Sequence, residues 1–362
     1  MSTQAKTESE YRRFLAPDSK CLNDDERKIV RSISEEVLYT HQIEATLQFI
    51  DEIVDKNASQ SEPRSGIVVG DAGTGKTTTI EILKGRFPEI TDEFHFGHQR
   101  RQPLLAVSLP ANITQKSMAQ TLLQTLGHYA NLSGNTKQLT DRLCETIKAC
   151  EVETIIIDEL QHLRGLGNVS RNSASASLRA ARNWIKDLVN RLPHLSVILM
   201  GVPETLMLID GESQLERRFT KVHEIKPFAP PQTGCTEFAS FVDCLVDAVI
   251  QHSGVIKSAE QIYDNPNWAA RFFGTTVGNP SRTKDAVTDA ALYAYRDGRD
   301  HILLTDFHAA FAIRRQSRTR LEEIQRRREE SDAVLRSVNN GDVDPFTATD
   351  DAVNNLIMPL AA

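Results

Sequence analysis

The chain has 362 residues, of which 40% are hydrophobic and 25% charged, and these ordinary values predict a globular protein with more than one folded unit. No apolar run approaches the roughly 20 residues of a transmembrane helix, and the start, MSTQAKTESEYRR, lacks a signal peptide's apolar stretch, so we expect a cytoplasmic protein without a membrane partner. The net charge of −7 argues against a protein that coats nucleic acid with its whole surface, but it is compatible with a local DNA-binding face.

Residues 1–35 are mostly polar and are predicted to form an N-terminal extension. Apolar residues at near-helical spacing over 38–54 then predict a helix, which a polar loop follows. The run GIVVG at 66–70 is short, apolar and β-branched, as expected of a buried strand, and the glycine-rich turn after it leads into TTTIEILKGRF, a predicted helix. The pattern is therefore strand, loop and helix.

Strand and helix patterns alternate from there to about residue 228. The predicted strands are 104–109, 154–158, 196–201 and 221–228, and the predicted helices are 116–127, 137–150 and 178–192. Such alternation predicts an α/β domain over 36–229, in which a parallel sheet is flanked by helices on both faces.

The strand pattern ends at APPQTG, residues 229–234. Segments 236–251, 281–297 and 305–329 are helical in character, which predicts a small all-helical lid domain over 235–325. The remainder, 326–362, reads as a flexible C-terminal tail with a short apolar end.

Residues 70–77 read GDAGTGKT and match the pattern G-x-x-x-x-G-K-[ST] between a strand and a helix. In this pattern backbone N–H groups surround the phosphates of a nucleotide, the lysine reaches the outer phosphates and the Thr hydroxyl ligates Mg²⁺. The sequence therefore predicts a site for ATP and Mg²⁺, with Lys76 also catalytic and Thr77 a metal ligand. The residues predicted to bind the nucleotide are those of the loop and of the start of the helix, namely Gly70, Asp71, Ala72, Gly73, Thr74, Gly75, Lys76, Thr77 and Thr78.

A second motif, TIIIDE, occupies residues 154–159. The three isoleucines form a buried strand that delivers Asp158 and Glu159 to its carboxyl end, where open α/β sheets bind ligands. We expect Asp158 to hold Mg²⁺ through water, and Glu159 to orient or deprotonate the water that attacks the terminal phosphate.

Five further segments, YTHQIEATLQFI, DELQHL, RNWIKDLVNRL, ILMGVPE and QLERRF, make roughly residues 35–300 resemble the TniB/TnsC family of AAA+ transposition regulators. The resemblance implies an AAA+ P-loop NTPase fold and a role in a TnsC-type transposon, CRISPR-associated or related. It also implies an ATPase that assembles as a homo-oligomeric ring or helical filament on duplex DNA. Such a protein links a target-selector protein to a transposase, and ATP hydrolysis drives its disassembly.

The resemblance implies roles for three arginines. Arg217 and Arg218 in LERRF fall where AAA+ proteins place the arginine finger, which crosses a subunit interface to stabilise charge on the transferred phosphate, although a surface pair on a helix explains them equally well. Arg282 in GNPSRTKDAV resembles the lid's nucleotide-sensing arginine. Ser281 can be aligned at the same place, and a solvated helix arginine is an equal alternative.

In relatives the loop after the second strand faces DNA, which implies contacts from Asn112, Thr114, Gln115 and Lys116. Lys116 would pair with a phosphate, whereas ANITQK is also an ordinary polar helix cap. A departure follows the fourth strand, since Val202 stands where relatives commonly have Thr or another polar residue, and weak hydrolysis is expected.

Two other functions fit the same sequence. Accessory ATPases of secretion systems share much of this core, and a nucleotide-switched scaffold with little hydrolysis needs the same phosphate loop. The arginine-rich run 314–328 is either a contact for phosphates or an acidic partner, or the solvated face of a helix. By analogy with the family, the C-terminal tail would dock a transposase or another transposition subunit, while an unstructured remnant is equally compatible.

Overall fold

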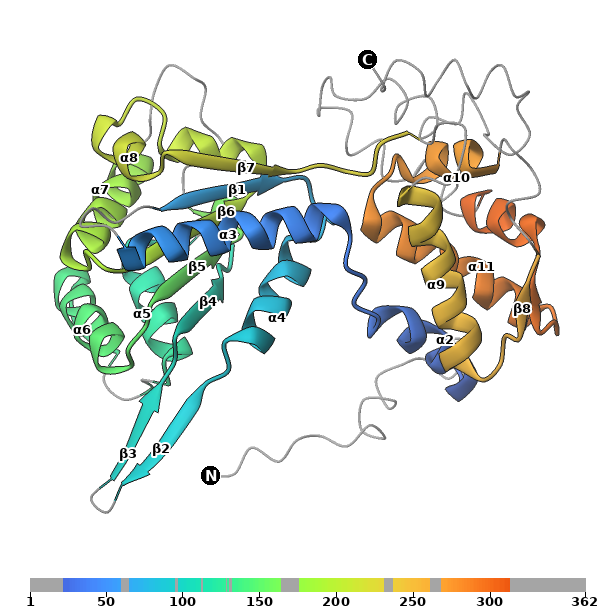
Figure 1. The fold of residues 1–362 in the computed structure, drawn as a ribbon, viewed down its shortest axis with the longest axis horizontal. Coiled ribbons are helices and arrows are strands. Elements are labelled where there is room, and N and C mark those ends of the chain that lie inside the picture. The colour runs from blue at the N-terminus through green and yellow to red at the C-terminus, as the bar shows by residue number, and fades with distance from the viewer. Residues whose placement is uncertain are drawn as a thin grey trace. The chain divides into compact units, whose positions relative to one another are not determined.

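The computed structural model describes residues 22–59, 65–94, 97–111, 113–127, 129, 132–163, 176–230, 237–260 and 268–312. Contacts divide the chain into two units. The α/β unit comprises residues 37–228 and 279–281, and the helical unit comprises residues up to 36, 229–278 and from 282 onward (Figure 1). Within the part described, none of the helices combines the length and the apolar character needed to cross a bilayer.

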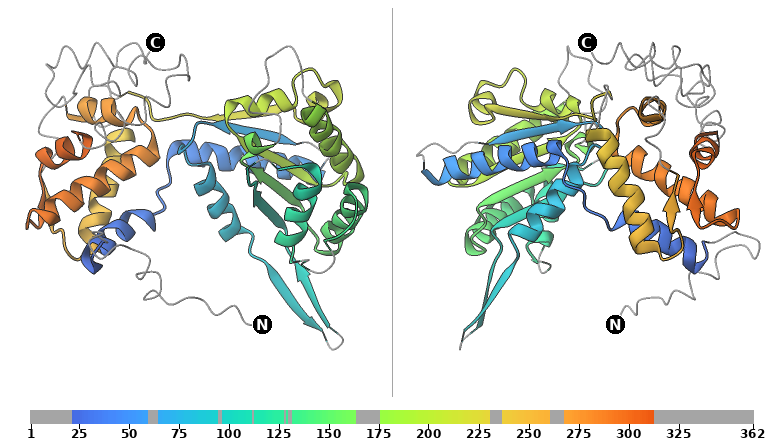
Figure 2. Two further views of the ribbon diagram at one scale, coloured as in Figure 1. Left: turned by 180° about the vertical axis from the view of Figure 1, so that it is seen from behind. Right: turned by 45° about the vertical axis from the view of Figure 1, so that its right-hand side comes forward.

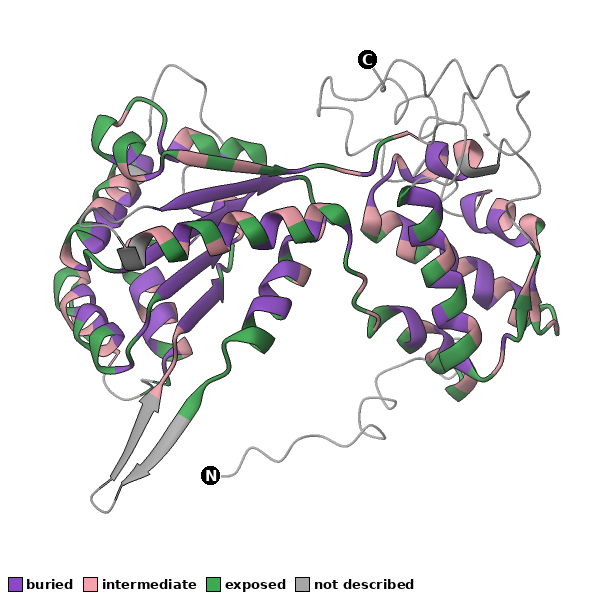
Figure 3. Ribbon diagram, viewed as in Figure 1, coloured by how far each residue is buried: buried purple, intermediate pink, exposed green. Residues whose placement is uncertain are grey.

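A five-stranded parallel sheet forms the centre of the α/β unit, in the order β4-β5-β6-β1-β7. The strands are β1 (Gly66–Gly70), β4 (Leu104–Ser108), β5 (Thr154–Asp158), β6 (Ser196–Gly201) and β7 (Lys221–Ile225). Strands β1, β5 and β6 are buried along their whole length, as Figure 3 shows, because helices cover both faces. In a parallel sheet all carboxyl ends lie at one edge, so the loops after these strands meet there.

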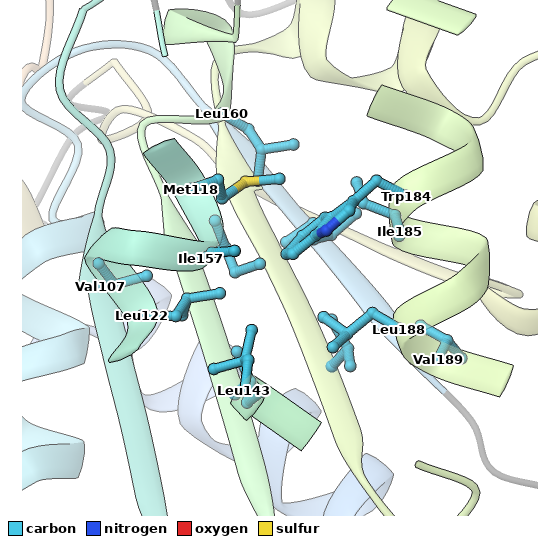
Figure 4. Close-up of a cluster of buried hydrophobic side chains, with 14 of the residues drawn as sticks. Val107, Met118, Leu122, Leu143, Ile157, Leu160, Trp184, Ile185, Leu188 and Val189 are labelled. Carbon is cyan, nitrogen blue, oxygen red and sulfur yellow. The ribbon is translucent and has the colours of Figure 1, made fainter. Parts of the chain in front are cut away.

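The two faces of the sheet carry different helices (Figures 1 and 2). One is covered by α3 (His41–Ser59) and α4 (Lys76–Arg86), the other by α5 (Gln115–Thr125), α6 (Thr136–Ala149) and α7 (Ala176–Arg191). Successive side chains of β5 point to opposite faces of the sheet, so Ile156 packs with the first group of helices while Ile155 and Ile157 pack with the second. Figure 4 shows Ile157 in the larger core, where Trp184 also donates a hydrogen bond to Thr140 Oγ1 at 2.9 Å.

Four shorter elements complete the α/β unit. An antiparallel hairpin of β2 (Ile90–Phe94) and β3 (Gly97–Arg101) extends away from the sheet in every view of Figures 1 and 2, and the sequence analysis did not predict it. The others are the 3₁₀ helices η2 (Leu160–His162) and η3 (Pro203–Leu208), and the short helix α8 (Ser213–Arg218). The predicted strand, loop and helix around residues 70–77 are confirmed, as is the alternation that follows.

The helical unit contains α2 (Asp24–Ser34), α9 (Glu237–Ser253), α10 (Trp268–Thr276), most of α11 (Pro280–Arg296), a helical segment at 304–312 and a short parallel pairing of β8 (Ser258–Ala259) with β9 (His301–Ile302). Its core is aromatic, with Phe238 packed edge-on against Phe273 at a centroid distance of 5.3 Å. The basic run 314–328, the rest of the helix predicted at 305–329 and the tail 326–362 lie outside the described residues.

Part of the predicted N-terminal extension belongs to this helical unit. Helix α2 begins with a capping box between Asn23 and Glu26, and it packs against α9. Ile29 and Ile33 are buried, and Glu26 accepts a hydrogen bond from Arg296 Nε at 2.6 Å. Helix α2 therefore belongs to the same unit as the predicted lid, whereas the sequence predicted a separate N-terminal extension over 1–35.

A half-buried carboxyl on α9 makes the stability of the helical unit depend on pH. Burial, and then repulsion from Asp247, raises the pKa of Asp243 from 3.8 to about 6. The pKa of Asp243 is therefore higher in the folded protein than in the unfolded chain, so protonation of this carboxyl stabilises the folded state. That contribution to the free energy of unfolding is complete below about pH 4 and is lost as the pH rises through 6.

We therefore expect Asp243→Asn to raise the free energy of unfolding near neutral pH by on the order of 1 kcal/mol, after allowance for solvent screening. The gain should vanish near pH 4, where aspartate is already neutral in the folded state. Urea unfolding of both proteins at the two pH values measures it. An equal gain at both would show that the carboxylate's charge is not the cause.

Candidate phosphate-binding site

The glycine-rich loop joins the carboxyl end of β1 to the start of α4. Gly73 and Gly75 have φ angles of 80° and 109°, a left-handed conformation that glycine adopts without steric cost. Gly75 is the N-cap residue of α4, and no side chain caps this helix. Its first N–H groups are therefore directed at whatever anion the loop holds.

Side chains within the loop fall into two groups. Thr74 is buried, and its hydroxyl donates to the Asp71 carbonyl oxygen at 2.8 Å, which fixes the turn from inside. Asp71, Ala72 and Thr77 are exposed. Thr78 is half-buried. The exposed Thr77 hydroxyl is thus available to a ligand, as the sequence analysis required.

Lys76 places its ammonium inside the loop. The side chain is buried, and Nζ donates to the carbonyl oxygens of Gly70 at 2.5 Å and Asp71 at 2.8 Å. Burial lowers the pKa of Lys76, while the nearby carboxylates of Asp158 and Glu159 oppose that shift. A bound polyphosphate would favour the charged form, so the loop is arranged for an anion.

Asp158 ends β5 at the same edge of the sheet. It is buried, burial raises its pKa, and Oδ1 accepts a hydrogen bond from the Glu159 N–H at 2.8 Å. Carboxylate and hydroxyl oxygens are the ligands that Mg²⁺ prefers, so the pair of Asp158 and Thr77 fits a magnesium ion.

Glu159 has an unusual backbone for a non-glycine residue, with φ 59° and ψ 37°. Its Oε2 accepts a hydrogen bond from Gln161 Nε2 and lies 3.9 Å from His162 Nε2. The His162 ring is itself held, since Nδ1 lies 2.8 Å from the Leu109 carbonyl oxygen. Strained backbone of this kind clusters at functional sites. Gln161 was not predicted to be a site residue, although it lies within the DELQHL segment.

A second contact that the sequence analysis missed is made by residues 279–281. Asn279 Nδ2 donates to the Ala72 carbonyl oxygen at 2.9 Å, and the Ser281 N–H donates to the Gly73 carbonyl oxygen at 3.2 Å. A Cβ added to Gly73 would lie 2.7 Å from Ser281 Cβ. In GNPSR, therefore, Asn279 and Ser281 touch the phosphate loop. Arg282 belongs to the helical unit, and its sensing role stays a prediction.

The two candidate finger arginines lie at the opposite edge of the sheet. The Arg218 carbonyl oxygen accepts a hydrogen bond at 3.0 Å from the N–H of Ser65, which precedes β1, whereas Gly70 ends that strand. A five-residue strand spans about 17 Å. Arg217 is exposed, and Arg218 Nη2 donates to Asn190 Oδ1 at 3.2 Å. The structure does not bring this pair to the chain's own phosphate loop.

The residues predicted to face DNA open α5. Asn112 lies outside the described residues, while Thr114 is the N-cap of α5 and forms a capping box with Ser117. Thr114 therefore acts as a helix cap, which is the alternative role that the sequence offered for this segment. Lys116 is exposed and Gln115 partly so. The N–H of Ile113 donates to the His162 carbonyl oxygen at 3.2 Å, which joins this segment to the turn after Glu159.

Comparisons with known proteins bear on the family and the fold. Residues 28–227 match the family model described as Bacterial TniB protein. No curated protein matched the sequence. Cdc6p from Pyrobaculum aerophilum aligns over 78% of this chain and 70% of its own, with a TM-score of 0.53 and 13% identity. The ORC1 protein of Aeropyrum pernix, solved in complex with DNA, aligns over 94% and 88%, with a TM-score of 0.51 and 14% identity. Likeness at this level of identity supports the fold alone.

Proposed function

This chain belongs to the TniB family and has the AAA+ fold, a parallel sheet flanked by helices, and we propose that it is an ATPase that binds duplex DNA and regulates transposition. One observation carries the catalytic part of the proposal. The buried ammonium of Lys76 lies within the phosphate loop, close enough to Asp158 and Glu159 for their charges to affect its pKa. A cation beside two carboxylates at one sheet edge suits phosphoryl transfer to water.

Each group would have one task in that reaction. The loop N–H groups and Lys76 bind the phosphates, and Thr77 and Asp158 hold Mg²⁺, the latter through water. When bound, Mg²⁺ neutralises charge on the phosphates. Glu159 orients the attacking water and accepts its proton.

The arginine pair supports the proposal of a homo-oligomer. Because Arg217 and Arg218 lie at the amino edge of the sheet, either can reach a phosphate only in a neighbouring copy. ATP bound between copies would then favour a ring or helical filament around duplex DNA, in which form the protein recruits the transposase and the target selector. Hydrolysis would dismantle this assembly.

The DNA-binding part of the proposal is tested with Lys116. We expect ATP-dependent binding to duplexes of any sequence, with affinity that falls steeply as salt rises. Lys116→Ala should weaken binding uniformly across sequences and reduce the slope of log K against log salt by about one, because one phosphate contact is lost. Fluorescence anisotropy over a salt series, with a non-hydrolysable ATP analogue, measures both.

Lys148→Ala is the matched control, since Lys148 is also exposed but lies in the last turn of α6, at the other edge of the sheet. It should leave affinity and slope unchanged. Absence of DNA binding with ATP or its analogue would overturn the proposal, and equal effects of the two variants would remove Lys116 from the interface.

The family match favours transposition over the secretion-system alternative. The scaffold with little hydrolysis is a second candidate on one observation, that the residue after β6 is the apolar Val202. A measured ATP turnover that Glu159→Gln abolishes would exclude it.

A further inference from the structure

The side chain of Gln161 links the proposed catalytic acid to the end of the neighbouring strand. Nε2 donates to Glu159 Oε2, and Oε1 accepts a hydrogen bond from the Val202 N–H at 3.3 Å. Strands β5 and β6 are adjacent and parallel, so the residues after them lie side by side. Gln161 spans the space between these two strand ends.

The two partners together determine which way the amide of Gln161 faces. The Val202 N–H can only donate, and an ionised Glu159 carboxylate can only accept. The oxygen of the amide must therefore face Val202 and its nitrogen Glu159, as observed. In this orientation the amide gives the acid a fixed donor.

A buried hydroxyl lies behind the same amide. Thr205 is fully buried, and within the described part of the chain its Oγ1 has no hydrogen-bond partner. A Cβ added to Gly201 would lie 2.3 Å from Thr205 Oγ1 and 2.9 Å from Gln161 Oε1, so both oxygens face one small space. An unpaired buried hydroxyl is destabilising, and a modest rotation that lets it donate to Gln161 Oε1 would remove that cost.

We propose that Gln161 is a positioning residue for Glu159, held in place by the Val202 N–H and the Thr205 hydroxyl. It supplies the link between the acid and the end of β6 that a polar side chain at position 202 would otherwise make. The inference rests on the proposed ATPase function. Because the link orients the base and does not touch nucleotide, it affects turnover and leaves nucleotide affinity alone.

The first test compares kinetic constants. Gln161→Ala should lower kcat for ATP about 10- to 100-fold, the range of a mispositioned base, and leave KM and the Kd for a non-hydrolysable analogue within about 2-fold of wild type. Thr205→Val, which exchanges the hydroxyl for a methyl group of similar volume, should lower kcat less, because the Val202 N–H remains.

A charge substitution separates positioning from a merely structural effect. Gln161→Glu keeps the length of the side chain but replaces the donor amide by a carboxylate that repels Glu159, so kcat should fall at least as far as in Gln161→Ala while KM and the Kd for the analogue stay within about 2-fold of wild type. A variant that only loosened the fold would weaken analogue binding as well. Analogue binding and thermal unfolding of each variant report folding.

Two variants together distinguish a failure of the positioning role of Gln161 from a failure of the proposed ATPase function. If Glu159→Gln turns over ATP like wild type, Glu159 is not the base and both fail. If Glu159→Gln is inactive while Gln161→Ala keeps a wild-type kcat, only the inference fails. Should Gln161→Ala not fold, kcat of Gln161→Glu decides, and a wild-type kcat in that variant overturns the proposal.

Discussion

Replacing Lys76 by alanine is expected to raise the dissociation constant for ATP by at least about 100-fold, the effect of losing more than one charge-assisted hydrogen bond. The ammonium is already in place, since Nζ bonds the carbonyl oxygens of Gly70 and Asp71. A polyphosphate in the loop would meet a fixed cation in a buried position, where charge interactions are stronger than in water. Alanine leaves the loop N–H groups as the remaining attraction.

Isothermal titration with ATP and Mg²⁺ measures this loss. Lys84→Ala is the matched control, because Lys84 lies on the same helix but is exposed and pairs with Glu81 at 2.8 Å on the surface. It removes the same charge from α4 and should bind ATP as wild type does. If both variants bound normally, the assignment of residues 70–78 as the nucleotide site would be wrong.

Arg217→Ala should lower kcat about 1000-fold, in the range of a lost arginine finger, with little change in ATP binding by the isolated chain. Arg218→Ala should have a smaller effect. The difference follows from their exposure, because Arg217 is exposed in the last turn of α8 whereas Arg218 is half-buried. Steady-state turnover at saturating ATP and DNA measures both effects.

A mixing experiment tests whether the finger comes from a neighbouring copy. Lys76→Ala and Arg217→Ala proteins are each expected to be inactive alone. In an equal mixture about a quarter of the interfaces, by random pairing in a head-to-tail assembly, join an intact Lys76 to an intact Arg217, so activity should return. No recovery, in mixtures shown to co-assemble, would contradict a finger supplied across an interface.

Several features were predictable because neighbours in the sequence create them. The strand, loop and helix around 70–77 follow from a buried apolar run, glycines that accept positive φ, and a helix start. The strands at 154–158 and 196–201 have the predicted bounds, because strands covered on both faces are continuously apolar. Helix α2 also has a local signal in the capping residues Asn23 and Glu26, which lie within a polar segment.

The hairpin over residues 90–101 was not predictable in this way. Its two strands, ITDEF and GHQRR, are mostly polar and lack the continuous apolar run by which the strands of the main sheet were predicted. The roles of Arg282 and of the residues at the start of α5 also stay predictions, because they depend on groups that meet only when nucleotide, DNA or another copy is bound.

The phosphate loop, the two carboxylates after β5 and the alternation that builds the sheet could all be predicted, since each depends on residue type and spacing along one segment. Which distant groups meet is visible only in the folded chain. Gln161 reaches Val202, Asn279 reaches Ala72, and Arg218 lies beside Ser65, far from its own loop. These contacts depend on strand order and on hydrogen bonds between residues as much as 207 positions apart, which no local pattern encodes.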